Sequence, residues 1–473
     1  MPHPHYTTLS PLYRLPNEIL EHIFQLFILR EANETYDNLE VWDIYESSYA
    51  AGFCPGWPDV FALNDGPWLL GRVCSSWRSI VLSSYALWQS FQVRPCQRPF
   101  AIDIMSTWIS RCGTFPLQVS FAGWESRTNP PFIDMLFSES SRWRTLALSM
   151  VSPSSSLWRM ILLPSRRDRY ECLERIVLVS EESGYLFDIG IYYVFDNAPK
   201  LCSVINNSDY IIGTLPWGRL TEYQGFGHLP FTHHVSVLRH SQNLERCCLV
   251  IQYDLLNDLS LGTPLILRQL TQLSTKWHSY SSGISGLLRN LRLPALKRLS
   301  ILGGKHYTFD SVFVDLSYLL QSSDCQLKTL ELSGSVVNRE NLSELLASAP
   351  TITYLRLWVM QVPMPIHNSA LALLNTKEKA HILLRDLTTL EFCLPEPSDL
   401  SAIDLMALTE LVRWRWSNFP VESHIQRLYI AHWKPFVSDE RRTRSLPPLL
   451  ETLNEEGLQV MVCSCKEGAW DRC

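Results

Sequence analysis

The sequence contains no run of about 18 apolar residues, the length that a membrane-spanning helix needs. Residues 1–15 hold neither a basic leader nor an apolar segment of the kind that directs secretion. Basic residues are not in excess, since 41 Lys and Arg face 47 Asp and Glu, and the net charge of −6 offers no general attraction for nucleic acid or anionic membrane. We therefore expect an intracellular protein, in the cytoplasm or the nucleus, whose partners are proteins and not nucleic acid or membrane.

Motifs for catalysis and metal binding are also missing. No G-x-S-x-G elbow, P-loop or glycine-rich dinucleotide turn occurs. The 13 cysteines are an odd number without a tight framework, which indicates buried small side chains in a reducing compartment, and 463–465 is only an isolated C-x-C. Four histidines lack zinc spacing, and we interpret them as a polar loop: His228, His233, His234 and His240. The sequence predicts no metal, no cofactor and no enzymatic activity.

The stretch from Leu15 to Phe27 predicts an amphipathic helix with an unusually wide apolar surface. Pro16 suits the first helical position, and Glu18 places a carboxylate in the positive first turn. Apolar side chains then fall in two adjacent stripes, one with Ile19, Ile23 and Phe27, the other with Leu20, Phe24 and Ile28. Such a helix needs cover from two sides. A small domain supplies one side, and we expect a partner to supply the second.

A second segment, from Pro67 to Phe91, follows the same logic. Asp65, Gly66 and Pro67 mark a helix start. One apolar face then recurs at three- and four-residue steps through Leu70, Val73, Cys74, Trp77 and Val81. Ser83 or Ser84 is a candidate cap for a short third helix with Tyr85, Leu87, Trp88 and Phe91. Three helices of this kind predict a small bundle.

At these residues the chain resembles the F-box family, in particular the F-box proteins of mushroom-forming fungi. The resemblance is carried by LP-x-EIL-x-x-IF at 15–24 together with LLGRVCSSWRSIVLSS-x-x-LW at 69–88, and it covers an F-box domain at 15–91. It implies docking onto a Skp-type adaptor and, through it, a cullin scaffold. The adaptor-binding positions that it implies are Leu15, Pro16, Ile19, Leu20, Ile23, Val73, Cys74 and Trp77.

An insertion at 31–66 departs from the family pattern. It is far longer than the roughly 2 to 8 residues that usually connect packed helices. It holds acidic residues and no Lys or Arg, yet its aromatic residues argue against a purely solvated linker. Two outcomes are open: the insertion folds on binding, or it packs on the bundle and blocks the adaptor face.

The remaining domain boundaries follow from composition. Residues 1–14 predict a flexible N-terminal lead. Pro95 and Pro99 disfavour a helix through 92–99, which predicts a hinge. Residues 100–473 then form the second part of the chain, ending in a cap at about 445–465 with a helix from Pro447, a stop at Gly457 and an apolar strand.

The second part carries an internal repeat: Leu, two residues, apolar, one residue, apolar. Full or degenerate copies begin at Trp143, Leu173, Leu201, Leu220, Leu244, Leu270, Leu296, Leu327, Ile352, Leu387 and Leu411. Their spacing is close to the roughly 20 to 29 residues of leucine-rich repeats, which the array resembles. The last two apolar positions point to one face of a short strand, and the residue between them points out.

The predicted fold class is therefore α/β: an N-terminal α-helical F-box followed by an irregular leucine-rich-repeat-like solenoid. Helix-like pieces separate the strands, most clearly from Asn341 to Ala349. The Asn ladder of regular repeats is absent, so we expect uneven curvature. A generic α/β domain with short parallel strands is the alternative. Arg413 and Arg415 alternate with Trp414 and Trp416, which on a strand places both arginines outward as a candidate target-binding spot.

These patterns favour a non-catalytic substrate receptor. The F-box binds the Skp-type adaptor of a cullin-RING ubiquitin ligase, and the repeats bind a target protein. The predicted function of the chain is therefore to position the target near the ligase. The alternative is a ligase-independent interaction scaffold whose F-box-like helices pack only against its own repeats. A third hypothesis, an enzyme built on an α/β array, is not favoured, because these residues contain no recognisable catalytic site.

Overall fold

The computed structural model describes most of the chain. It describes residues 15–36, 57–96, 98–122, 132–150, 170–180, 195, 198–207, 215–226, 229, 231–251, 263–277, 283–303, 310–333, 338–358, 366–376, 382–394, 403–432 and 447–464. The predicted lead at 1–14 and insertion residues 37–56 lie outside them. The described residues form two compact units, the first up to Leu201 and the second from Cys202 onward.

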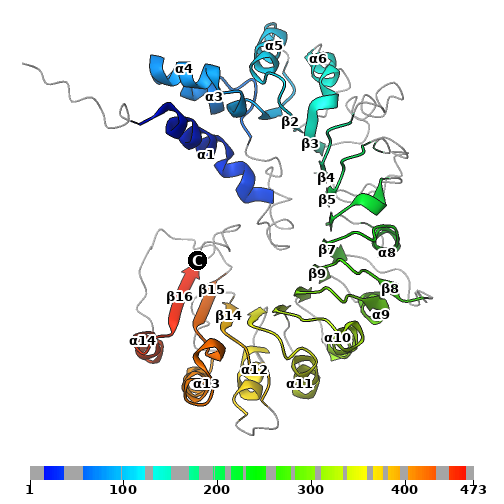
Figure 1. The fold of residues 1–473 in the computed structure, drawn as a ribbon, viewed down its shortest axis with the longest axis vertical. Coiled ribbons are helices and arrows are strands. Elements are labelled where there is room, and N and C mark those ends of the chain that lie inside the picture. Colours follow the sequence, from blue (N-terminus) through cyan, green and yellow to red (C-terminus); the bar gives the residue numbers. More distant parts are fainter. Residues whose placement is uncertain are drawn as a thin grey trace, which may run out of the picture. The chain divides into compact units, whose positions relative to one another are not determined.

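The first unit combines helices with parallel strands (Figure 1). Its helices are α1 (Asn17–Tyr36), α3 (Gly66–Leu70), α4 (Ser75–Ser83), the 3₁₀ turn η2 (Tyr85–Leu87), α5 (Ala101–Arg111), α6 (Phe132–Ser138) and the 3₁₀ turn η3 (Ser140–Arg142). Its strands are β1 (Ser90–Val93), β2 (Leu117–Phe121), β3 (Trp143–Met150) and β4 (Arg175–Ser180). They pair in parallel in chain order.

The predicted second helix is two helices. The prediction of one continuous apolar helix face is wrong, because α3 ends at Leu70 and the chain turns before α4 begins at Ser75. Cys74 caps α4, since its Sγ accepts the Trp77 amide at 3.4 Å. The predicted third helix is also wrong. It is the 3₁₀ turn η2, and Phe91 lies in strand β1.

Three tryptophans join the predicted F-box helices to the first strands. Trp68 of α3, Trp88 after η2 and Trp108 of α5 contact one another, with ring centroids 4.9 to 5.7 Å apart. The Trp108 indole N–H donates to the Trp88 carbonyl at 2.8 Å, and the Trp88 indole donates to Val81 at 2.9 Å. The residues predicted as a hinge at 92–99 begin inside β1 and lie between Trp88 and Trp108. The unit therefore continues across that segment.

The second unit alternates strands and helices. Its strands are β5 (Ser203–Asn207), β6 (Glu222–Gly225), β7 (Arg246–Ile251), β8 (Leu265–Ile266), β9 (Gln272–Trp277), β10 (Leu291–Arg292), β11 (Arg298–Gly303), β12 (Thr329–Ser333), β13 (Tyr354–Trp358), β14 (Thr389–Leu394), β15 (Arg427–His432) and β16 (Gln459–Ser464). Its helices are η5 (Trp217–Arg219), α8 (Phe231–His240), α9 (Gly283–Asn290), α10 (Asp310–Ser323), α11 (Arg339–Ala347), α12 (Ile366–Leu374), α13 (Leu405–Asn418), η8 (Val421–Ser423) and α14 (Pro448–Glu455).

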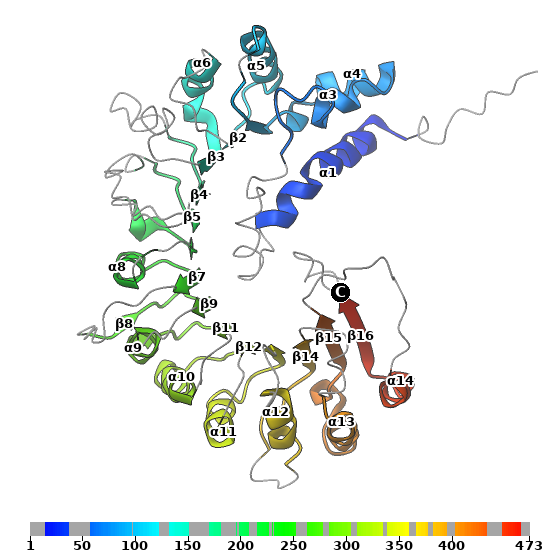
Figure 2. The ribbon, with the colours of Figure 1, turned by 180° about the vertical axis from the view of Figure 1, so that it is seen from behind.

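In this unit the strands form one layer and the helices α8 to α14 another (Figure 2). The long strands run in the order β5-β6-β7-β9-β11-β12-β13-β14-β15-β16, and neighbouring strands in this order pair in parallel. β8 and β10 form a separate short pair. The α/β fold class is thus confirmed, with sheets of parallel strands that carry helices.

The repeat pattern locates the core. Ten of the eleven predicted copies coincide with strands, β3 to β7, β9 and β11 to β14. In β12, for example, Leu330 and Leu332 are fully buried and pair in register with Leu355 and Leu357 of β13. Each such leucine contributes about 1.5–3 kcal/mol by burial. The residues predicted as a cap form helix α14 and strand β16, with Gly457 between them at a positive φ of 115°.

The eleventh copy, which begins at Leu411, is wrong. Leu411, Trp414 and Trp416 lie in helix α13, whose Asp404 cap accepts the Ala407 amide at 2.9 Å. Spacings of three residues suit a helical face as well as this strand pattern, and the buried residues here follow the helical period. The strand of this unit is β15 instead, with Leu428 and Ile430 buried. β1 and β2 were likewise not predicted.

Candidate functional site: the open face of helix α1

Helix α1 has two apolar faces in different environments. Leu20, Phe24 and Ile28 are buried. The other face is open to solvent, with exposed fractions of 48% for Ile19, 43% for Ile23, 57% for Leu26 and 55% for Phe27. The open positions are spaced i, i+4, i+7 and i+8, so they lie on one side of the helix. We call this set the α1 stripe.

The buried face of α1 packs within the first unit, against α3, α4 and η2. Phe24 contacts Trp77 of α4, with ring centroids 4.7 Å apart. The Ser84 hydroxyl donates to the Glu21 carboxylate. At the start of α1, the Pro16 carbonyl accepts the amides of Ile19 and Leu20, each at 3.1 Å. These contacts fix the helix so that the α1 stripe points outward.

The predicted adaptor-binding residues divide by exposure. Pro16, Ile19, Ile23 and Val73 are exposed, Val73 by 57%, and Leu15, Cys74 and Trp77 are partly exposed. Leu20 is buried, so its place among contact residues is wrong, because it packs inside the first unit.

Leu26 and Phe27 were absent from the predicted contact set. Phe27 already belonged to the same predicted stripe as Ile19 and Ile23, so extending that stripe by one turn finds it. Leu26 follows Ile19 by seven residues, two helical turns, which is the signal that finds it. The α1 stripe is therefore longer than the predicted contact set, and Leu26 makes it wider than the predicted apolar stripe.

Arg413 and Arg415 do not lie side by side on a strand. Both belong to α13, where Arg415 is fully buried and its guanidinium donates to the carbonyls of Leu383 and Leu384, each at 2.8 Å. Burial lowers the pKa of Arg415 to about 10. Arg413 is exposed and forms a two-pronged ion pair with Glu456, at 2.5 and 3.0 Å. The outward target-binding spot predicted at these residues is wrong for Arg415, which holds the backbone of the preceding loop.

The outward positions of the strands are not uniformly solvated, contrary to the simple strand pattern. Register places Glu331, Arg356 and Glu391 in one row on β12, β13 and β14. Arg356 lies between the two acids, 3.4 Å from Glu331 and 3.1 Å from Glu391. The Tyr354 hydroxyl donates to Glu391, and burial raises the pKa of this phenol. This row is a paired network in which Arg356 and Glu391 are buried and Glu331 is partly exposed.

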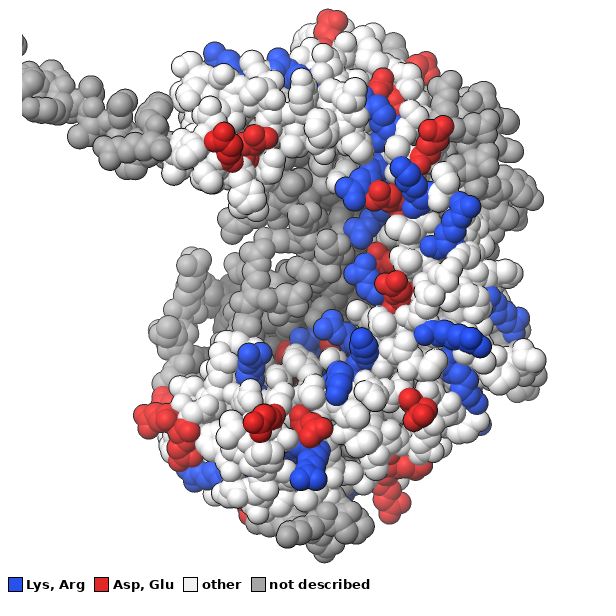
Figure 3. All heavy atoms as spheres, in the orientation of Figure 1, with Lys and Arg blue, Asp and Glu red and all other residues white. Residues whose placement is uncertain are grey.

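Exposed basic residues line the amino ends of the second unit's strands. They are Arg246, Lys297, Arg298, Lys328 and Arg427, which we call the basic rim. Figure 3 shows Lys and Arg gathered along this strand side. The Lys328 amide donates to the Lys297 carbonyl at 2.8 Å, so these two residues lie on neighbouring strand starts, about 4.8 Å apart. Glu222 pairs with Arg246 at 3.5 Å, and Glu245 is exposed beside it.

Sequence reasoning missed the basic rim. Its signal was present for four of the five members, because Arg246, Lys297, Arg298 and Lys328 each follow the first apolar residue of a repeat copy by one or two positions. Arg427 begins β15, which no predicted copy covers.

Neither the scan against protein-family models nor the search of curated proteins finds a match to the chain. Among the described residues, no helix is both long and apolar enough to cross a membrane. In the same part of the chain, no three His, Cys, Asp or Glu side chains come together as metal ligands do.

The described histidines of the predicted polar loop lie in a helix. The predicted polar loop is wrong, because His233, His234 and His240 belong to α8; His228 lies outside the described residues. His234 is fully buried, and burial lowers its pKa to about 3. His233 is partly exposed, and burial lowers its pKa to about 4. These neutral side chains belong to the packing of the second unit.

We predict that substitutions of the two arginines of α13 differ in their effect on stability. Arg415→Met should lower the free energy of unfolding by about 3 kcal/mol, because buried carbonyls lose charge-assisted hydrogen bonds. Arg413→Met removes only a solvent-exposed ion pair and should leave stability nearly unchanged. Denaturant unfolding of both variants measures this difference. Equal losses of stability would contradict the assignment of Arg415 as a buried structural residue.

We also predict an acid-sensitive contribution from His234. Its folded pKa lies below the roughly 6.5 of an unfolded histidine, so its contribution is complete above that value and declines as pH falls toward 3. The contribution of His234 to the free energy of unfolding should fall by about 2 kcal/mol between pH 7 and pH 5. Denaturant unfolding at both pH values compares the native chain with His234→Leu, whose pH dependence should be smaller by that amount. An unchanged dependence would show that His234 is not the responsible group.

Proposed function

We propose that this protein is the substrate-recognition subunit of a Skp-cullin-F-box ubiquitin ligase. Its first unit binds a Skp-type adaptor through an F-box, and its second unit is an irregular leucine-rich-repeat solenoid that binds a target protein. The observation that carries the proposal is the α1 stripe. Four large apolar side chains on one fixed helix face favour a protein partner.

Further support comes from how the stripe is held. Trp77 contacts Phe24 behind it with the two rings tilted, and Val73 adds a further exposed apolar side chain at the turn between α3 and α4. A preformed apolar face costs little ordering on association, so more of its burial appears as affinity. Skp-type adaptors are the partners implied by the F-box pattern at the same residues.

The basic rim is the surface that we assign to the target. Exposed Lys and Arg at strand starts favour an acidic segment of a partner and raise its rate of encounter. Holding that partner on the same chain as the adaptor raises the effective concentration of its lysines near a charged ubiquitin carrier. In this scheme the chain itself supplies binding and no bond-making step.

We predict that charge on the α1 stripe abolishes adaptor binding. The double variant Ile19→Glu, Ile23→Glu should bind a purified Skp-type adaptor at least tenfold more weakly, because carboxylates then enter an apolar interface. Stability should change little, since both positions are exposed. Titration calorimetry with the full-length chain measures the affinity.

The matched control is Met406→Glu, Val421→Glu, which alters two exposed apolar residues of the second unit. It should bind the adaptor as the native chain does. If the native chain forms no complex with the adaptor, the ligase-independent scaffold is favoured. If the stripe variant binds with native affinity, the assigned surface is wrong.

For the basic rim, we predict selective loss of the target. Lys297→Glu, Lys328→Glu should release proteins that co-purify with the native chain while retaining the adaptor, because the reversed charges repel an acidic partner. Co-purification followed by mass spectrometry reads out both. Retention of every co-purified protein by this variant would refute the rim as the target-binding surface.

A further inference from the structure

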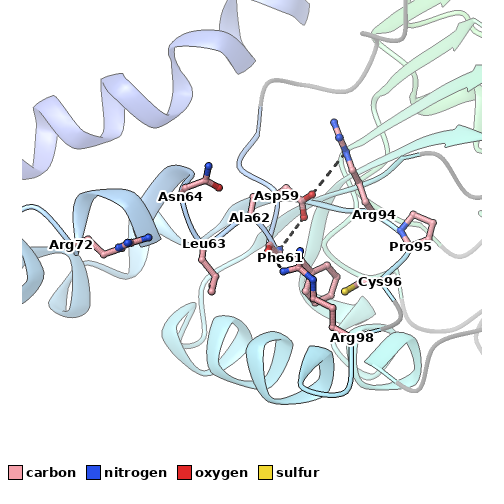
Figure 4. Close-up of a pocket in the computed structure, with 10 residues that line it drawn as sticks. All are labelled: Asp59, Phe61, Ala62, Leu63, Asn64, Arg72, Arg94, Pro95, Cys96 and Arg98. Carbon is pink, nitrogen blue, oxygen red and sulfur yellow. Dashed lines mark hydrogen bonds and ion pairs between the residues drawn. The ribbon is translucent and has the colours of Figure 1, made fainter.

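The first unit contains a pocket of about 640 Å³, a volume within the range that small ligands occupy (Figure 4). Three parts of the chain line it: Asp59 with residues 61–64, Arg72 after α3, and residues 94–96 with Arg98 after β1. These residues are separate from the α1 stripe, so the pocket carries no part of the adaptor proposal.

The pocket has a surplus of positive charge. Three arginines, Arg72, Arg94 and Arg98, face one acid, Asp59. Asp59 is already engaged, since its carboxylate accepts the Phe61 amide at 2.9 Å and lies 4.0 Å from Arg94. Arg98 donates to the Phe61 carbonyl at 3.4 Å, and neither Arg72 nor Arg98 forms an ion pair with a described acid. Two guanidinium groups thus have N–H donors to offer.

An apolar wall stands beside these donors. Phe61, Ala62, Leu63 and Pro95 contribute to the lining, and Figure 4 shows Leu63 between Arg72 and Arg98. The Phe61 ring is buried against Phe132, with centroids 5.0 Å apart. A ligand that suits this lining therefore combines an anionic group with an apolar body.

The loop that forms the pocket is fixed before any ligand arrives. Val60 donates its amide to Gln92 at 3.0 Å, and the Gln92 amide donates to Pro58 at 2.9 Å. The Trp68 indole N–H also donates to the Val60 carbonyl, at 3.1 Å. Binding therefore requires little ordering of the protein backbone.

We propose that this pocket binds a phosphate monoester of a small molecule with an apolar, preferably aromatic, body. A phosphate monoester carries close to two negative charges and several acceptor oxygens, which suit a pocket with a surplus of positive charge. A carboxylate carries only one negative charge. The Phe61 and Leu63 side chains receive the body of the ligand.

Phenyl phosphate is the test ligand, titrated calorimetrically into the full-length chain. We expect it to bind at least tenfold more tightly than inorganic phosphate, because only the ester reaches the apolar wall. The double variant Arg72→Gln, Arg98→Gln should lose at least tenfold in affinity for phenyl phosphate. Both arginines are exposed, so the unfolding temperature of this variant should match that of the native chain.

Arg268→Gln, an exposed arginine outside the pocket, is the matched control and should keep native affinity. Absence of phenyl phosphate binding to the native chain would overturn the proposal. So would equal affinity of the double variant and the control. Inorganic phosphate binding as tightly as the ester would overturn the apolar half of the site.

Discussion

Burial of the inward-pointing apolar side chains of parallel strands is the constraint on which both units depend. One strand cannot cover its own leucines, so each is shielded by neighbouring strands and by the helix that follows it. The register that aligns Leu330 with Leu355 also aligns the outward residues between them. The paired Glu331–Arg356–Glu391 network and the basic rim are therefore consequences of the same alignment that forms the core.

The first unit uses apolar burial differently. Its tryptophans Trp68, Trp88 and Trp108 pack together and connect α3 and η2 to α5, so the helices are anchored to the strands that follow. On this support α1 buries one apolar face and leaves the other in solvent. An isolated helix has no reason to carry large apolar side chains outward, whereas a helix that docks on a partner has one. The proposed ligase role rests on this asymmetry.

Much of the fold was predictable because strand periodicity and helix capping are local. The copies from Leu296 to Leu387 all fall in strands, and the helix predicted at Asn341 to Ala349 is α11, which Asn338 caps. The copy at Leu411 failed because its spacing also fits a helix, and the Asp404 cap decided the outcome. At the candidate site, the pattern found Ile19 and Ile23. It did not separate them from Leu20, because which of two adjacent stripes is buried depends on distant residues such as Trp77.

The central claim is that the α1 stripe is a protein-binding surface for a Skp-type adaptor. Hydrogen–deuterium exchange of the full-length chain, with and without a saturating adaptor, tests it most directly. The account predicts slower exchange in α1 and in the turn around Val73 when adaptor is present, with the strands of the second unit unaffected. Unchanged exchange of α1, or protection confined to the second unit, would contradict it.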